Sequence, residues 1–296
     1  MRQFTIATVA VCVIAAAGGL AAAGMPQVVA SPEAAAMPKT TAGPARTRPA
    51  TPASRQRGGH PAGGQATASP AATTEPTPPG TTTCAHPSFV TSAQFGMWNL
   101  APYFVDNDMW NSGGYQVTQT LYACSYSNWY VVATMNNDSG NAAVKTYPDA
   151  QKDFSEPRIS SLKSVTSTFA ETSPGTGIYE DAYDIWLNGI ASSGSTEVMI
   201  WTENHHQRPG GSLQGTATVD GRSYTVWRKG GYIAFVASSN FTSGTMNLLT
   251  FFQWIMGQGW IPGNSTLGQV DYGVELVSTN GVPATFSFSD FSVSAS

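Results

Sequence analysis

Two glutamates lie inside segments whose other residues are typical of buried β-strands. Glu197 stands in "STEVMIW" and Glu275 in "DYGVELVS". An ionised carboxylate taken out of water is costly unless it is paired or neutralised. With no cation beside it in the sequence, Glu275 has the apolar setting that raises the pKa of a general acid. Taken alone, Glu275 is typical of an ordinary strand residue. As a partner for Glu197 it suits glycosidic hydrolysis, which requires two carboxyl groups on either side of the acetal bond.

Alternation along the first of these strands separates two faces. One face carries Glu197, Met199, Trp201 and Glu203, and the other is uniformly apolar and belongs in the core. Acids beside a thioether and a flat aromatic ring suit a concave sugar-binding sheet. An exposed glutamate on an outer sheet is the alternative that this strand alone leaves open.

A third acid, Asp184 in "YEDAYDIWLNG", precedes Glu197 by about one hairpin. If the two strands pair, Asp184 lies beside Glu197 and helps to set its protonation and orientation. A calcium site formed by Glu180, Asp181 and Asp184 is a second interpretation of this segment. The segment lacks the glycine and the ligand spacing of a known calcium loop, so we predict no metal site.

The chain changes character near residue 84. Residues 1–30 combine an early positive charge, an apolar run and small residues, which predicts a secretory signal peptide. An uncleaved anchor that tethers the protein to the cell surface is the alternative, because the apolar run nearly reaches membrane-spanning length.

Residues 31–83 contain 10 of the 19 prolines and no aromatic residue, which predicts a disordered linker. Residues 84–296 contain all eight tryptophans and are long enough for one domain with a substantial core.

Cysteine usage agrees with export. Cys12 lies in the signal segment, which leaves Cys84 and Cys124 as an even pair in a secreted domain. A disulfide between them is therefore expected, and it would close a loop of about 40 residues.

The charge balance of residues 84–296 restricts the partners. This part of the chain has 16 acidic and 8 basic residues, which argues against nucleic acid and anionic membranes. A neutral polysaccharide is compatible with this charge. We expect a monomer with no membrane partner beyond an uncleaved N-terminal anchor.

Short segments rich in Val, Ile, Thr and aromatic residues alternate with Gly, Asn, Ser and Pro through residues 84–296. "TVDGRSYTVW" places Asp-Gly between two such segments, which predicts a tight hairpin. One segment has a clear helical period, with Leu248, Phe251, Phe252 and Ile255 on one side. Many strands with one helix predict an all-β fold, a two-sheet β-jelly-roll sandwich with a concave substrate cleft and a single α-helix.

Five blocks of the sequence together resemble glycoside hydrolase family 12. They are "STEVMIW", "GTATVDGRSYTVW", "AYDIWLNG", "DNDMWN" and "YGVEL", and the resemblance covers the chain from Cys84 onward. Members of that family are retaining endo-β-1,4-glucanases and xyloglucanases on a β-jelly roll with a single helix. By position, the resemblance implies that Glu197 is the nucleophile, Glu275 the acid/base and Asp184 the aspartate that assists the nucleophile.

The resemblance also implies substrate-binding residues. Trp110 takes the place of a tryptophan platform in a donor-side subsite, and Met199 and Trp201 follow the nucleophile as they do in the family. Asp108 departs from the family, which often has asparagine there, and the segment after the acid/base lacks the usual proline and aromatic. His205 is expected to rim the cleft and contact substrate or solvent, because a His-His pair without further ligands is a weak zinc signal.

We therefore expect a secreted, retaining endo-glycosidase that hydrolyses β-1,4-glucan linkages in cellulose, mixed-linkage glucan or xyloglucan, with no cofactor. The main alternative is a non-catalytic β-glucan-binding module or lectin on the same sandwich. A related jelly-roll xylanase is a third interpretation. Only an enzyme requires the two carboxyl groups to face each other.

Overall fold

The computed structural model describes residues 84–136 and 142–296. The signal peptide and the linker expected from the sequence lie outside these residues. Within the described part of the chain, no helix has the length and apolarity needed to cross a membrane.

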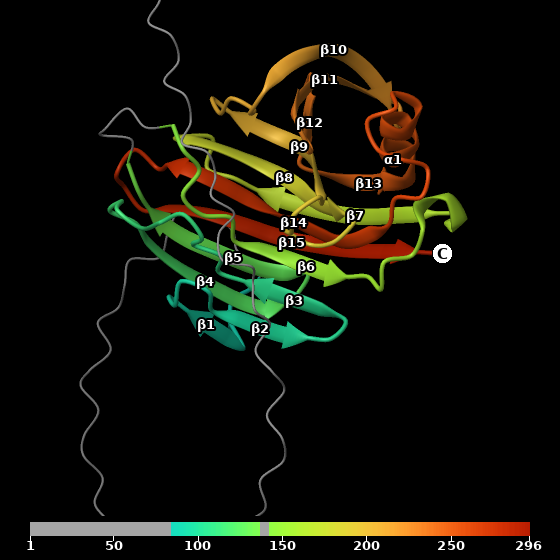
Figure 1. Cartoon of the computed structure of the whole chain (residues 1–296). Helices are drawn as coiled ribbons and strands as arrows, with labels where there is room; N and C mark the ends of the chain where they lie inside the picture. Colours follow the sequence, from blue (N-terminus) through green and yellow to red (C-terminus); the bar gives the residue numbers. More distant parts are fainter. Residues whose placement is uncertain (1–83, 137–141) are drawn as a thin grey trace, which may run out of the picture. The chain divides into compact units, whose positions relative to one another are not determined.

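The described strands form two sheets (Figure 1). The smaller sheet contains six strands: β1 (Phe89–Thr91), β4 (Thr118–Ser125), β5 (Asn128–Thr134), β7 (Val165–Thr172), β13 (Ser243–Asn247) and β15 (Ala284–Ala295). Their order across the sheet is β1-β4-β5-β15-β7-β13. Neighbours in this order pair antiparallel. Some of them, such as β5 and β15, are far apart in the chain.

The larger sheet carries the candidate site and contains nine strands. They are β2 (Met97–Leu100), β3 (Tyr103–Asp106), β6 (Asp149–Asp153), β8 (Ile178–Leu187), β9 (Thr196–His205), β10 (Ser212–Val219), β11 (Arg222–Lys229), β12 (Tyr232–Ala237) and β14 (Leu267–Ser278). Their order is β10-β11-β12-β9-β8-β14-β6-β3-β2, and the pair β12–β9 is parallel. The two strands with the expected acids, β9 and β14, thus flank β8.

The hydrophobic core lies between the two sheets, and aromatic rings join them. On the smaller sheet, Trp129 and Phe288 stack with ring centroids 4.1 Å apart. Tyr272 of the larger sheet meets Phe288 edge-on at 5.8 Å, and Phe169 meets Tyr183 in the same way at 5.7 Å. These large buried rings dominate the packing energy of such an interface. The predicted two-sheet sandwich is confirmed.

The helix predicted from its apolar period is α1 (Leu248–Gly257), which directly follows β13 (Figure 1). Its buried residues are Leu248, Leu249, Phe251, Phe252 and Ile255. Phe251 packs edge-on against Tyr224 and Phe235, with centroids 5.4 and 5.1 Å away. A residue set with period 3.6 thus buries one helix face against the larger sheet. A short 3₁₀ helix, Ile159–Ser161, is the other helical element that the structure describes.

Two local predictions are also confirmed. Asp220 and Gly221 join β10 to β11 with φ values of 49° and 74°, the left-handed backbone that a two-residue hairpin turn requires. Cys84 and Cys124 form a disulfide across a sequence separation of 40, which ties the start of the described domain to β4. On the chain-entropy account, closing a loop of this length stabilises the fold by about 4 kcal/mol.

Gly273 fixes how closely β6 approaches β14. It pairs with Asp149 of β6, and a Cβ atom on Gly273 would lie 2.1 Å from the carbonyl oxygen of Pro148 and 2.8 Å from the Cα of Asp149. Because both contacts are with backbone or its adjoining atoms, the strands would have to separate.

We predict that Gly273→Ala lowers the free energy of unfolding by about 1–3 kcal/mol, the usual cost of overpacking. Urea unfolding measures this change. Gly113→Ala is the matched control, because a Cβ there meets nothing within 4 Å. Equal stability of the two variants would contradict the close approach of β6 to β14.

Candidate active site

The register of three adjacent strands builds the candidate site. On β8, Ala182 stands opposite Trp201 of β9 and Gly273 of β14. The core-facing residues of the same strands include Val198 and Ile200, as predicted. The opposite face, here called the site face, carries one set of residues from the three strands: Glu180, Ala182, Asp184, Glu197, Met199, Trp201, Asp271, Gly273 and Glu275.

Glu197 and Glu275 interact although the register places them far apart along their strands. Trp186 of β8 pairs with Glu197 on one side and with Gln269 of β14 on the other. Glu275 lies six residues further along β14 than Gln269. In a flat sheet their Cα atoms would be roughly 20 Å apart, from the rise per residue of a strand. The charge of Glu275 nevertheless raises the pKa of Glu197.

A tyrosine next to Glu197 reports the same proximity. Tyr232 of β12 pairs with Glu197, and the charges that act on its hydroxyl group are those of Glu275, Glu197 and Glu180. The two glutamates thus act on the same hydroxyl group. Curvature of the larger sheet would bring the two carboxyl groups toward each other.

Both carboxyl groups are held largely out of water. Burial raises the pKa of Glu197 to about 8, and the charge of Glu275 adds to the rise. Burial also raises the pKa of Glu275, and a hydrogen bond with Glu180 opposes this effect. Two interacting acids titrate as a pair, so between the two pKa values of the pair one carboxyl group is ionised and the other is protonated. One ionised and one protonated carboxyl group is the state that glycosidic hydrolysis requires.

Glu180 is a site residue that the sequence analysis weighed only as a calcium ligand. It stands directly opposite Glu275 in the pairing of β8 with β14 and is fully buried. Burial and then the charge of Glu275 raise the pKa of Glu180 well above its usual value. Glu180 in turn opposes the rise in the pKa of Glu275. The sequence did contain a signal for this position. Glu180 and Asp184 are four residues apart in one strand, so alternation places both side chains on the same face.

Asp184 lies in a row of acids on the site face. It stands opposite Met199 of β9 and Asp271 of β14. Met199 is two residues from Glu197 in the same strand, so Asp184 and Glu197 are near neighbours on the site face. The hydroxyl group of Tyr147 donates to the carbonyl of Ala182 at 3.0 Å and experiences the charge of Asp184 most strongly after burial. The expected pairing of the two strands is present, and assistance of the nucleophile by Asp184 stays a prediction.

Met199 and Trp201 lie on the site face as alternation predicts. Both are 1% exposed and pack in a second small cluster with Ala182, Ala234 and Val236. Their position makes them a supporting layer beneath the acids, and direct contact with substrate stays a prediction for both.

Trp110 and Asp108 differ sharply in exposure. Trp110 is 45% exposed, one of the few large apolar side chains at the surface, and can offer its ring to a ligand. Asp108 is 1% exposed, and its carbonyl accepts the N–H of Tyr147 at 2.8 Å. Asp108 thus connects the segment before Trp110 to the strand region around Tyr147. Substrate contact by either residue stays a prediction.

The sequence prediction for Glu203 was wrong. The register of β8 and β9 shifts between the pairs Ala182–Trp201 and Asp181–Glu203, so Thr202 forms a bulge. The extra residue reverses the alternation. Glu203 therefore leaves the site face, and its Oε1 accepts a hydrogen bond from the core residue Tyr179 at 2.8 Å.

His205 follows Glu203 to the same side of the strand. Its ring stacks on Tyr179 with centroids 5.2 Å apart, and its Nδ1 lies 2.7 Å from the carbonyl oxygen of Gly177. The structure therefore does not bring His205 to the acids of the site face. Contact of His205 with substrate has no support in this arrangement.

The chain is similar to characterised glycosidases and to an inactive relative. Residues 101–296 match Glycosyl hydrolase family 12. Endoglucanase A of Aspergillus kawachii is 27% identical over 223 residues, which cover 68% of this chain and 91% of that protein. The inactive glycoside hydrolase XLP1 of Phytophthora nicotianae is 25% identical over 225 residues, covering 67% of this chain and 91% of that protein. The xyloglucanase domain of NopAA from Sinorhizobium fredii, solved with cellobiose, has a TM-score of 0.62 and 26% identity, covering 70% of this chain and 100% of that one.

Two packed sheets with paired acids on the outer face of the larger one are the architecture of a β-jelly-roll glycosidase. The chain belongs to glycosyl hydrolase family 12. This confirms the resemblance that the five sequence blocks indicated.

The shared proton predicts how activity depends on pH. Below the lower pKa of the pair both acids are protonated, and above the higher one both are ionised, so kcat/KM should follow a bell-shaped profile that lies at higher pH than the usual carboxyl pKa values would give. Because the charge of Glu275 raises the pKa of Glu197, Glu275→Gln should lower the pKa of Glu197. A carbon-detected NMR titration of the carboxyl groups measures that value. An unchanged Glu197 pKa in the variant would show that the two groups do not interact.

Proposed function

We propose that this protein is an endo-β-1,4-glucanase that acts by the retaining mechanism. The observation that carries the proposal is the position of Glu197 and Glu275 on one face of the larger sheet, where Glu275 raises the pKa of Glu197. A sugar-binding module needs exposed aromatic rings, but it has no need for two acids that share a proton. The endoglucanase and xyloglucanase relatives support β-1,4-glucan as the substrate class.

The reaction proceeds in two displacements at the anomeric carbon. In the first, the Glu197 carboxylate forms a bond to that carbon while the glycosidic bond breaks, and Glu275 gives its proton to the leaving oxygen. In the second, the ionised Glu275 takes a proton from water. The water oxygen then displaces Glu197 and releases the sugar. The proton shared by the pair is thus used and restored in each cycle.

The neighbouring residues act on these two carboxyl groups. Glu180 faces Glu275 and opposes a further rise in its pKa, which favours transfer of the Glu275 proton to the leaving oxygen. Asp184, one row from Glu197, assists the nucleophile in this proposal, and Trp110 stacks against a sugar ring on the donor side. Glucan chains present apolar C–H faces to such a ring. No step requires a metal or cofactor.

We place the enzyme outside the cell. Residues 1–30 have the pattern of a secretory signal peptide, and the Cys84–Cys124 disulfide fits an oxidising compartment. Polymeric glucans are extracellular substrates, which agrees with this location.

We predict that Glu197→Gln abolishes hydrolysis of a soluble β-1,4-glucan and that Glu275→Gln lowers kcat by about 10²–10⁴-fold, the usual contribution of acid–base catalysis. Both amides match the size of the acids, so folding should be retained. Reducing-sugar release measures hydrolysis, and urea unfolding measures stability.

An aryl cellobioside with a good leaving group separates the two roles. Such a substrate needs no protonation of the leaving oxygen, so Glu275→Gln should still form the glycosyl-enzyme and release a burst of phenol, whereas Glu197→Gln should not. Near-normal turnover of the glucan by Glu197→Gln would overturn the nucleophile assignment. Binding of the glucan without any turnover by the unmodified protein would instead favour the lectin-like alternative, for which the inactive relative is a precedent.

Trp110→Ala should raise KM for cello-oligosaccharides roughly ten-fold or more with a smaller effect on kcat, because an exposed aromatic anchor contributes mainly to binding. Val282→Ala, a change at a residue that is also exposed (56%), is the matched control. Steady-state kinetics on cello-oligosaccharides and on xyloglucan oligosaccharides give both constants. Equal KM values for the two variants would exclude Trp110 from the substrate-binding surface.

A further inference from the structure

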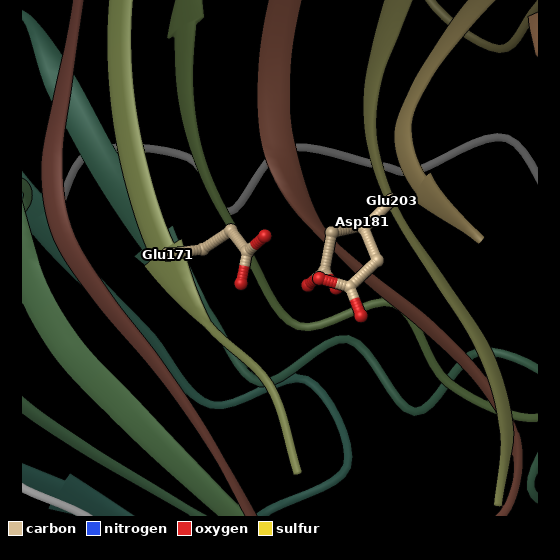
Figure 2. A group of neighbouring side chains, drawn as sticks. All are labelled: Glu171, Asp181 and Glu203. Carbon is tan, nitrogen blue, oxygen red and sulfur yellow. The ribbon is translucent and has the colours of Figure 1, made fainter. Parts of the chain in front are cut away.

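Three acids outside the site face form a second cluster, and they come from both sheets (Figure 2). Glu171 lies on β7 of the smaller sheet, and Asp181 and Glu203 lie on β8 and β9 of the larger one. One carboxylate oxygen from each lies within 4.8 Å of the others. Figure 2 shows the Glu171 carboxyl group pointing across the gap toward the other two.

The cluster contains buried oxygens that no donor in the described chain satisfies. Asp181 is fully buried, and its Oδ2 accepts a hydrogen bond from Ser173 Oγ at 2.8 Å. Its Oδ1 has no hydrogen-bond partner among the described residues. Glu171 is 6% exposed, and neither of its carboxyl oxygens meets strict hydrogen-bond geometry with a described donor, although Ser173 lies near enough to act on it. Buried polar atoms are almost always satisfied, so these oxygens point to a missing partner.

The surroundings indicate the sign of that partner's charge. One oxygen of each carboxyl group lies within 4.8 Å of the other two, and Glu171 and Asp181 are buried. Three acids that repel one another in a poorly solvated space are stabilised most by a cation among them.

We propose that Glu171, Asp181 and Glu203 bind a calcium ion that links the two sheets. The donor set consists of oxygen atoms, which hard cations prefer, and contains no nitrogen or sulfur. Calcium–oxygen distances are about 2.3–2.6 Å, so two ligands on opposite sides of one ion are about 4.8 Å apart. The three oxygens are no farther apart than two such opposite ligands, so one ion can contact all three.

The three acids can supply part of a calcium coordination shell, and water completes it. Glu171 has two oxygens available, Asp181 offers Oδ1, and Glu203 offers the oxygen that does not accept the Tyr179 hydroxyl. Calcium takes 6–8 oxygen ligands in flexible geometry, whereas magnesium requires a strict octahedron. Glu203 is partly exposed, which gives the ion and its waters a route to the site.

The bulge at Thr202 gives this cluster its third member. Without it, Glu203 would continue the alternation of Glu197, Met199 and Trp201 and would lie on the site face. Bulges are often located where a sheet re-aims a functional side chain. Glu203, which alternation placed on the site face, is thus a ligand of the proposed calcium ion.

Calcium titration of the full chain tests this proposal. After treatment with a chelator, isothermal titration calorimetry with CaCl₂ should show one site per chain. Thermal unfolding should shift upward by about 5–10 °C when free calcium is about 100 times its Kd. Absence of both signals, or an equal shift with MgCl₂, would overturn the assignment of a calcium site.

Variants of the cluster locate the site. Glu171→Gln and Glu203→Gln should each remove the calcium-dependent shift or reduce it at least three-fold, while Glu156→Gln, at an exposed acid outside the cluster, should keep it. Glu171→Gln should fold, because the amide has the size of the protonated acid. A full calcium response in both cluster variants would contradict the proposal. Glu197→Gln should retain the calcium response, so this test does not depend on whether the protein hydrolyses glucans.

Discussion

The partial removal of Glu197 and Glu275 from water is the constraint on which the rest of the structure depends. Two ionised carboxylates in this setting would be costly, whereas two acids that hold one proton carry a single negative charge, which the proposed mechanism uses as an acid and a nucleophile. Their meeting requires strands β9 and β14 to curve around β8. Gly273 contributes by allowing β6 to approach β14 closely, two residues before Glu275.

Strand β8 separates two groups of acids that have different tasks. Glu180 and Asp181 are consecutive, and their side chains point to opposite faces of the sheet. Glu180 faces Glu275 on the site face, and Asp181 faces Glu171 and Glu203 between the sheets. A cation held by the second group would fix the backbone that positions the first. The peptide bond between Glu180 and Asp181 would then connect the packing of the two sheets with the protonation of the acids on the site face.

Much of this arrangement could be predicted from local patterns. The helix followed from the spacing of Leu248, Phe251, Phe252 and Ile255, and the two faces of β9 followed from alternation up to Trp201. Alternation failed at Glu203, because a bulge depends on pairing between strands and leaves no mark in the sequence of one strand. Glu180 was not recognised as a neighbour of Glu275, because that contact arises from a register between segments almost 100 residues apart.

The anomeric configuration of the first product tests the central claim most directly. Proton NMR of a cello-oligosaccharide digest, recorded before mutarotation, reports that configuration. If Glu197 forms a covalent bond to the anomeric carbon, the new reducing end appears first as the β-anomer. Initial appearance of the α-anomer would mean that water attacks directly, and it would contradict the roles assigned to both glutamates.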